Sequence, residues 1–268
     1  MKGRAYAAGT VLNALATGIG SAFPIDLVTE VKVELGGSGV FVNGVARKSR
    51  LADEILKHFG VKAGVMVKSE IPTGSGLGSS SAFANALIVA ISRALGLKLS
   101  AFDVLKLNAE LSLRAGVSYT GALDDAAASL LAKFVVTDNS KMRILRLDEV
   151  KGYAAVLIPR FGRGRIELEE MRRRSGELEK AVELALRGDY CGAMKLNTSF
   201  YCRLIGYPVE IAELGWKSGI CCGLSGNGPS FCAFGSKKEM LELKDVWSGF
   251  GEVLIRRIPE EPTVPLPS

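Results

Sequence analysis

The chain has 268 residues, 48% of them hydrophobic and 23% charged, which is typical of a globular protein of one or two domains. It contains no apolar run of about 18 residues and no secretory-type leader, so we predict a cytoplasmic protein with no membrane partner. The net charge of +6 suits an anionic small substrate. The five cysteines lack metal-type spacing and predict buried, reduced thiols.

The first 60 residues are predicted to be mostly extended chain. Residues 4–15 and 25–35 are expected strands separated by a glycine-containing loop, and 36–44 is an expected hairpin. Residues 51–60 form a predicted helix that carries the single histidine, His58, on its solvent side. One histidine excludes a multi-histidine metal site, and a catalytic base anywhere else in the chain must be Asp, Glu, Lys, Tyr or Cys.

The stretch Ile71–Ala82 reads Ile-Pro-Thr-Gly-Ser-Gly-Leu-Gly-Ser-Ser-Ser-Ala. It follows the alternating pattern of a strand over 65–71 and precedes the helical spacing of 83–95. Its glycines allow a close backbone approach, its serines can cap the helix, and a helix start suits a phosphate. The stretch is not the common phosphate loop, because no lysine follows its glycines.

Two adjacent carboxylates, Asp124 and Asp125, stand before a run of alanines in Tyr119–Ser129. They follow a predicted helix over Ser100–Gly116, which carries Glu110. A helix cap explains one aspartate but not both, since neighbouring residues point about 100° apart on a helix. We therefore expect one of them at a partly buried functional surface.

The second half is predicted to begin near residue 150, after a hairpin over 134–147. Its expected elements are a buried strand over 152–159, helices over 177–187, 191–204 and 208–217, and two strands around a glycine loop within 221–234. We predict domains 1–150 and 151–258, with a loose proline-rich tail over 259–268. The basic segment 160–174 is interrupted by acidic residues, so an RNA-binding role is the least favoured alternative.

Three segments resemble, in order, the three signatures of the GHMP kinases (galactokinase, homoserine kinase, mevalonate kinase, phosphomevalonate kinase). The matching residues are Asn13, Gly18 and Gly20 for the first; Pro72, Gly76, Leu77, Gly78, Ser79 and Ser80 for the second; and Ser225, Gly226, Gly228 and Pro229 for the third. The Glu-His pair of galactokinases is missing, which disfavours a sugar 1-kinase. The resemblance implies a two-domain α+β fold: an N-terminal S5-like domain with a mixed sheet and helices, and a C-terminal ferredoxin-like α/β sandwich.

Within this superfamily the chain is most similar to the archaeal shikimate kinases, through segments 8–14, 20–26 and 120–129. The similarity implies ATP- and Mg²⁺-dependent phosphorylation of shikimate to shikimate 3-phosphate, in chorismate and aromatic amino acid biosynthesis, by a monomer or homodimer with no nucleic-acid partner. Homoserine kinase and a mevalonate-pathway kinase are the alternatives. A non-catalytic nucleotide- or sugar-binding sensor is the alternative from another class.

The resemblance also implies roles for individual residues. Asp124 is the expected catalytic residue with Asp125 as the alternative, and Glu110 with Ser79 or Ser80 is expected to hold Mg²⁺. The expected nucleotide-binding residues are Pro72, Gly74, Ser75, Gly76, Leu77, Gly78, Ser79, Ser80 and Ser81. The expected substrate-side residues are Arg4, Thr10, Asn13, Ser21, Gly226 and Gly228. The carboxylate of shikimate calls for an arginine, and the sequence does not choose among Arg4, Arg160, Arg163 and Arg165.

Overall fold

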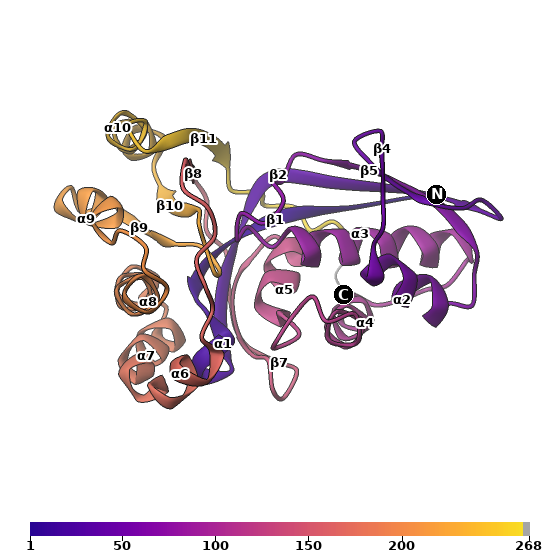
Figure 1. Ribbon diagram of the computed structural model, residues 1–268, viewed down its shortest axis with the longest axis horizontal. Coiled ribbons are helices and arrows are strands. Elements are labelled where there is room, and N and C mark those ends of the chain that lie inside the picture. Colours follow the sequence, from indigo (N-terminus) through magenta and orange to yellow (C-terminus); the bar gives the residue numbers. More distant parts are fainter. Residues whose placement is uncertain (265–268) are drawn as a thin grey trace.

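The computed structural model describes residues 1–264 and contains two sheets with helices packed against them (Figure 1). The larger sheet has seven strands in the order β4-β3-β5-β2-β6-β7, with β1 paired to β2. Only the β3–β5 pair is parallel among these strands. Its strands are β1 (Lys2–Leu12), β2 (Ile19–Leu35), β3 (Val40–Val42), β4 (Val45–Arg47), β5 (Ala63–Ser69), β6 (Phe134–Asp138) and β7 (Arg143–Asp148).

Helices of the first half gather on one side of β1 and β2 (Figure 1). These elements are α2 (Arg50–His58), α3 (Ser79–Ala94), α4 (Ala101–Arg114) and α5 (Leu123–Leu131), of which α3 and α5 pack on the two strands. The one-turn helix α1 (Ala14–Thr17) lies apart from them, at the connection from β1 to β2. Small residues permit this close packing: a Cβ at Gly3 of β1 would overlap the carbonyl oxygen of Ala86 in α3. The alanines of α5 are likewise fully buried, which brings the start of that helix against the sheet.

The smaller sheet has four antiparallel strands in the order β11-β8-β10-β9. These strands are β8 (Tyr153–Pro159), β9 (Cys221–Leu224), β10 (Phe231–Gly235) and β11 (Gly251–Arg257). The accompanying helices are α6 (Leu168–Arg173), a 3₁₀ turn (Ser175–Leu178), α7 (Glu179–Arg187), α8 (Tyr190–Ile205), α9 (Glu210–Lys217) and α10 (Lys237–Trp247). Within residues 1–264, no helix combines the length and apolarity that a membrane crossing requires.

The α+β fold class is confirmed by this mixed architecture. The helix around His58 is confirmed as α2, and His58 is exposed. The expected loop at Gly18 and Gly20 is shorter than predicted, because β2 already begins at Ile19. Because β2 is unbroken from Ile19 to Leu35, its first half pairs with β6 and its second half pairs with β5.

The end of the chain is held to the first half of the molecule. The backbone N–H of Thr263 donates to the carbonyl oxygen of Leu130 at the end of α5 (2.9 Å), and Val264 is buried. The segment predicted to be loose is therefore attached at this point. The remaining residues of that prediction, 265–268, lie outside the described residues.

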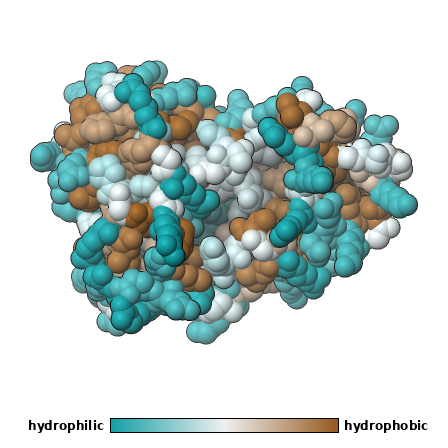
Figure 2. Space-filling view, viewed as in Figure 1, coloured by the Kyte–Doolittle hydropathy of each residue, from teal (hydrophilic) through white to brown (hydrophobic). Residues whose placement is uncertain are grey.

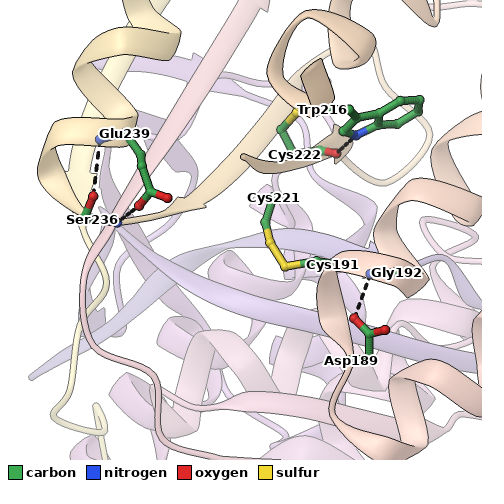
Figure 3. Close-up of a disulfide and its surroundings, with 8 residues drawn as sticks. All are labelled: Asp189, Cys191, Gly192, Trp216, Cys221, Cys222, Ser236 and Glu239. Carbon is green, nitrogen blue, oxygen red and sulfur yellow. Dashed lines mark hydrogen bonds between the residues drawn. A yellow bond between two sulfur atoms is a disulfide. The ribbon is translucent and has the colours of Figure 1, made fainter. Parts of the chain in front are cut away.

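The prediction that all cysteines are reduced is wrong for two of the five. Cys191, in the first turn of α8, forms a disulfide with Cys221 at the start of β9 (Figure 3). Asp189 caps α8 by accepting the N–H of Gly192 (2.9 Å) and so fixes the turn that carries Cys191. The two cysteines are 30 positions apart, and only the packing of α8 on β9 joins them, which no sequence spacing reveals. The other three cysteines, Cys202, Cys222 and Cys232, are buried thiols.

Cys191→Ser is expected to lower the thermal stability of the oxidised protein. The disulfide closes a loop of 30 residues, and constraining a loop of that size stabilises by about 3–4 kcal/mol. For a protein of this size that corresponds to a melting temperature lower by roughly 5–10 °C. Calorimetry with and without reductant measures the effect. Reductant should lower the wild-type value and leave the variant unchanged; an unchanged wild-type value would contradict the prediction.

Candidate active site

The glycine loop between β5 and α3 has the backbone geometry of an anion site. Gly74, Gly76 and Gly78 all adopt positive φ, at 72°, 84° and 65°. Gly78 is the N-cap of α3, and no side chain among residues 1–264 caps this helix. The predicted serine cap is therefore wrong, since Ser79 to Ser81 already lie in the first turn. The first N–H groups of α3 thus have no side-chain acceptor and can bind an anion.

Hydrogen bonds from both sides fix the shape of this loop. The amide of Ala8 on β1 donates to the carbonyl oxygen of Leu77 (3.1 Å), whose side chain is buried. From the loop between β9 and β10, the Ser225 hydroxyl donates to the Gly76 carbonyl oxygen (2.8 Å). A Cβ at Gly76 would overlap the Ser225 carbonyl oxygen, so the two loops approach at a distance that only glycine permits.

The first and third motif segments are also joined directly. The Gly226 amide donates to the Thr10 hydroxyl (2.8 Å). Asn13 donates from its side chain to the Gly226 carbonyl oxygen and to the Asn227 side-chain oxygen, both at 2.9 Å. The backbone N–H of Asn13 donates to the side-chain oxygen of Asn197 on α8 (2.9 Å). The first motif, the third motif and α8 are therefore joined by one set of hydrogen bonds, although they are far apart in the sequence.

Asp124 is held in place at the start of α5. It is 6% exposed, and its Oδ1 accepts the side-chain N–H of Asn139 at 3.0 Å. The hydroxyl of Thr137 donates to Asn139 Oδ1 (2.7 Å), which fixes the orientation of that amide. On the other side a Cβ at Gly20 would overlap the Asp124 carboxylate. Burial raises the pKa of Asp124, and the Asn139 hydrogen bond opposes that rise.

Asp125 lies beside the glycine loop rather than beside Asn139. A Cβ at Gly78 would be 3.4 Å from Asp125 Cγ. Its Oδ1 is buried with no hydrogen-bond partner among the described residues. Burial, and then the charge of Asp124, raise the pKa of Asp125 well above its ordinary value. Neither aspartate is the N-cap of α5, because Ala122 occupies that position.

A cavity of about 690 Å³ unites these groups. Its wall includes the two aspartates and residues from all three motif segments: Thr10, Asn13, Gly74, Gly76, Gly78, Ser79, Ser80, Ser81, Asp124, Asp125 and Gly226. The side chain of Arg163 also lines it, whereas Arg4, Arg160 and Arg165 do not. Figure 2 shows near-neutral surface in the centre of one face, between more strongly coloured ends.

Some predicted site residues support the cavity from behind. Pro72 and Ser75 interact within the glycine loop, where the Ser75 hydroxyl donates to the Pro72 carbonyl oxygen (2.7 Å). Gly228 packs so tightly on Tyr207 that a Cβ there would overlap the aromatic ring. Tyr207 accepts the Gly164 N–H (2.7 Å) and donates to the Asn227 carbonyl oxygen (3.1 Å). It therefore ties the Arg163 loop to the third motif.

Three predicted site residues are not brought to this cavity. Arg4 is on the exposed side of β1, 3.7 Å from the Asp26 carboxylate and over the ring of Tyr6. Ser21 is fully buried in β2, with a hydroxyl that has no partner among residues 1–264. Glu110 lines a neighbouring cavity.

The register of α4 explains the position of Glu110. Asn108 faces α3, where its side chain donates to the Ser81 carbonyl oxygen (2.9 Å), and Ser112 lies on the same face, 3.1 Å from the Asn108 side-chain oxygen. Glu110 is two positions from each and so points about 160° away. It is directed away from the serines with which it was expected to bind Mg²⁺.

Sequence reasoning missed the residues that orient the site. Asn139, Asn197 and Tyr207 orient the site through side-chain hydrogen bonds to residues 15, 184 and 43 positions away, respectively. Buried amides and phenols have no periodicity that marks such a role. A weak signal exists for Asn139 alone, because it follows Asp138 in a predicted turn.

Comparison with known proteins assigns the class. Residues 41–133 match the family described as GHMP kinases N terminal domain. The mevalonate kinase of Methanococcus jannaschii superposes with a TM-score of 0.71 at 14% identity, covering 96% of this chain and 97% of that one. A putative homoserine kinase from Listeria monocytogenes gives a TM-score of 0.67 at 17% identity, covering 97% of each. The fold and the motifs are those of a GHMP kinase.

Relatives with higher sequence identity show to which family of GHMP kinases the chain belongs. A shikimate kinase of Archaeoglobus fulgidus is 59% identical, over 98% of this chain and 94% of its own. Shikimate kinases of Methanothrix thermoacetophila and Thermococcus kodakarensis are 40% and 39% identical, over 94% and 95% of this chain and 91% and 98% of their own. The chain therefore belongs to the archaeal shikimate kinase family of GHMP kinases, as the motifs predicted.

Proposed function

We propose that this protein transfers the γ-phosphoryl group of ATP to shikimate, forming shikimate 3-phosphate in chorismate and aromatic amino acid biosynthesis. The observation that carries the proposal is the 59% identity to a shikimate kinase along 98% of the chain. The cavity supports it, because one space is lined by an anion-binding helix start and by two carboxylates. Phosphoryl transfer depends mainly on such positioning and charge stabilisation.

The glycine loop is proposed to hold the phosphates of ATP. Three positive-φ glycines and a helix start without a side-chain cap line the cavity, so the backbone N–H groups of this helix start are available to phosphate oxygens. A Cβ at Gly74 would meet no atom within 4 Å, so there is room for a ligand there. The loop is already fixed by the Ser225 hydrogen bond, and such a preorganised donor set stabilises charge without rearranging.

We propose Mg²⁺ as the accompanying ion, held by Ser79 or Ser80 and the phosphates. Both serines line the cavity. Asp125 lines the same cavity beside Gly78 and has a carboxylate oxygen with no hydrogen-bond partner among the described residues, so the oxygens present fit a hard cation. Bound there, the ion would neutralise charge on the phosphates. Glu110 is left out of this set because it faces another cavity.

Asp124 is proposed to accept or orient the proton of the substrate hydroxyl. Its raised pKa brings a carboxylate closer to the range useful for proton transfer. The Asn139 hydrogen bond fixes the orientation of this carboxylate at the wall of the cavity. Asp125 is the alternative for this role.

We also propose a division into domains 1–150 and 151–258, followed by the tail 259–268. Support comes from the two sheets, whose strands lie within residues 2–148 and 153–257 respectively. The protein is further proposed to act in the cytoplasm, without nucleic-acid or membrane partners, as a monomer or homodimer. Sedimentation of the purified protein would decide between those two states.

ADP release with a panel of alcohols tests the substrate. Purified protein with Mg-ATP is expected to release ADP with shikimate and to give only background with homoserine or mevalonate. The amount of ADP should equal the amount of shikimate consumed. ADP release with homoserine and none with shikimate would refute the substrate and leave the kinase fold untouched.

A further inference from the structure

A second cavity of about 480 Å³ adjoins the first, and the two share Leu15 and Tyr119 in their walls. The volume is within the range of roughly 300–1,000 Å³ typical of small-molecule sites. Apolar side chains of Leu15, Leu113 and Met142 form part of its wall. Such a wall suits the ring of a small cyclic acid better than a chain of phosphates.

The second cavity reaches the back of the proposed catalytic residue. Asn139 and Thr120 line it. The same Asn139 side chain donates to Asp124 Oδ1 (3.0 Å) and to the Thr120 hydroxyl (3.2 Å). Asp124 itself lines the first cavity, with the glycine loop. Asn139 therefore connects the second cavity to the carboxylate that lines the first.

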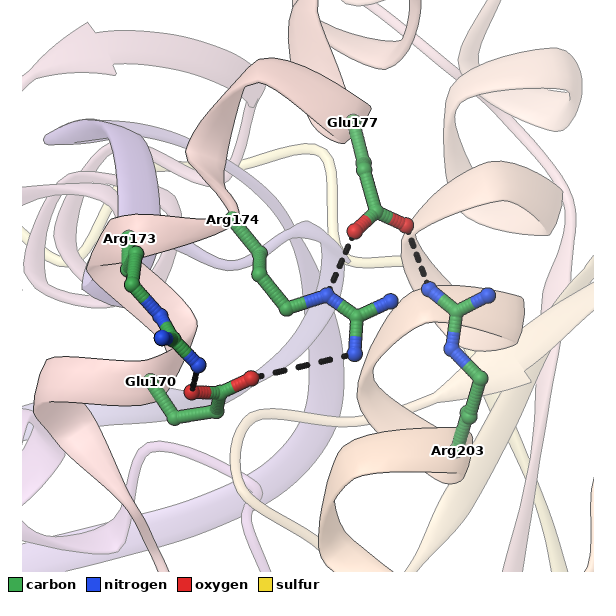
Figure 4. A network of polar contacts seen from close by, with 5 residues as sticks. All are labelled: Glu170, Arg173, Arg174, Glu177 and Arg203. Carbon is green, nitrogen blue, oxygen red and sulfur yellow. Dashed lines mark hydrogen bonds and ion pairs between the residues drawn. The ribbon is translucent and has the colours of Figure 1, made fainter.

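Only two charged side chains of the described residues line the second cavity, Glu110 and Arg172. Arg172 has no carboxylate within 4.0 Å among residues 1–264, although the two arginines that follow it, Arg173 at the end of α6 and Arg174 at its C-cap, are both paired. Arg173 and Arg174 contact Glu170, and Arg174 also binds Glu177 (2.5 Å) (Figure 4).

A network of ion pairs next to Arg172 holds α6, the helix that carries Arg172, in place. Glu177 binds Arg203 of α8 as well as Arg174, both at 2.5 Å (Figure 4). This network links α6 through Glu177 to α8, and α6 also packs on α1, another wall of the cavity. The neighbouring guanidinium groups are neutralised in place, whereas Arg172 is exposed and forms no ion pair among residues 1–264, so its guanidinium is available to a ligand carboxylate.

The other arginines suggested by the sequence are engaged elsewhere or line the other cavity. Arg4 lies near Asp26, Arg165 pairs with Glu167 (2.6 Å), and Arg160 donates to the Gly249 carbonyl oxygen (3.2 Å). Arg163 lines the cavity of the glycine loop, where a phosphate is the expected anion.

We propose that the acceptor substrate occupies this second cavity, with its carboxylate on Arg172 and a ring hydroxyl directed toward Asp124. The inference rests on the proposed shikimate kinase function and assigns a specificity-determining residue to it. A guanidinium can bind a carboxylate through two parallel hydrogen bonds. Glu110, on the same wall, accepts hydrogen bonds from the remaining hydroxyls instead of holding a metal ion.

The test compares Arg172→Gln with Arg173→Gln, its neighbour on the same helix that does not line the cavity. Arg172→Gln should raise the KM for shikimate on the order of 10- to 100-fold, as expected for a hydrogen bond between charged groups, with the KM for ATP unchanged. Arg173→Gln should leave both values near wild type, because the Arg173 side chain is exposed, its ion pair contributes little, and Arg174 still contacts Glu170. Arg163→Gln should raise the KM for ATP rather than that for shikimate.

A methyl ester of shikimate provides a second readout. The wild type should use it poorly, and Arg172→Gln should show no further loss, because the two changes remove the same interaction. An unchanged shikimate KM in Arg172→Gln, with an active wild type, would overturn the inference and leave the proposed function standing. A shikimate-specific defect in Arg163→Gln would overturn it too. A wild type inactive on shikimate would refute the proposed function itself.

Discussion

Gly78→Asp is expected to abolish ATP binding while the protein remains folded. Gly78 is the N-cap of α3, and a side chain there would lie against Asp125, 3.4 Å from its Cγ. The new carboxylate would lie at the proposed phosphate position, beside Asp125, and would repel the phosphates of ATP. The loss should be at least ~3 kcal/mol, the scale measured for one preorganised donor. Calorimetric titration with Mg-ATP measures it.

Gly78→Asn is the matched control, because it has the same shape without the charge. Asparagine also tolerates a positive φ such as the 65° found here. We expect Gly78→Asn to bind ATP more weakly than the wild type but clearly better than Gly78→Asp. Both variants should melt at similar temperatures. Normal ATP affinity in a folded Gly78→Asp protein would move the nucleotide to another site.

The sequence carried enough information for the fold class and for the anion loop. Alternating residues at 65–71 and helical spacing at 83–95 defined β5 and α3, because sheets and helices bury faces with those periods. Glycines at 74, 76 and 78 indicated a backbone conformation that other residues rarely adopt, and all three have positive φ. Local chemistry determined these features, so local patterns predicted them.

Features set by packing between distant segments could not be predicted. Glu110 has a carboxylate that could bind a metal ion, but the contacts of Asn108 and Ser112 place it on the side of α4 that faces away from α3 and its serines. The Asn139 hydrogen bond to Asp124 depends on β6 delivering the following turn beside α5. The disulfide depends on α8 covering β9. In each case the partner is chosen by the fold, and neither residue signals it alone.

Asp124→Asn is expected to lower turnover by ~10²-fold or more, the usual contribution of a positioned acid or base. Asparagine keeps the size of the side chain and an oxygen for the Asn139 hydrogen bond (3.0 Å), but it cannot accept the substrate proton. The KM for shikimate and for ATP should change far less, since the lost interaction acts mainly in the transition state. Steady-state kinetics with both substrates measures the split.

Asp125→Asn is the neighbouring comparison, and melting temperature is the second readout for both variants. Asp125→Asn should retain most activity. It should lose no helix cap, because Ala122 is the N-cap of α5. Burial raises the pKa of both carboxyls. Each therefore favours folding only while protonated, and that contribution is lost as pH rises through the raised pKa.

At neutral pH neither asparagine variant should melt below the wild type, and below pH 4 any advantage should disappear. An inactive, stable Asp124→Asn beside an active Asp125→Asn would place the proton-accepting role on the side of Asn139 and the second cavity. The reverse result would move that role to Asp125, beside Gly78 and the phosphate loop. The residue that loses activity thus also reports from which side the substrate hydroxyl approaches.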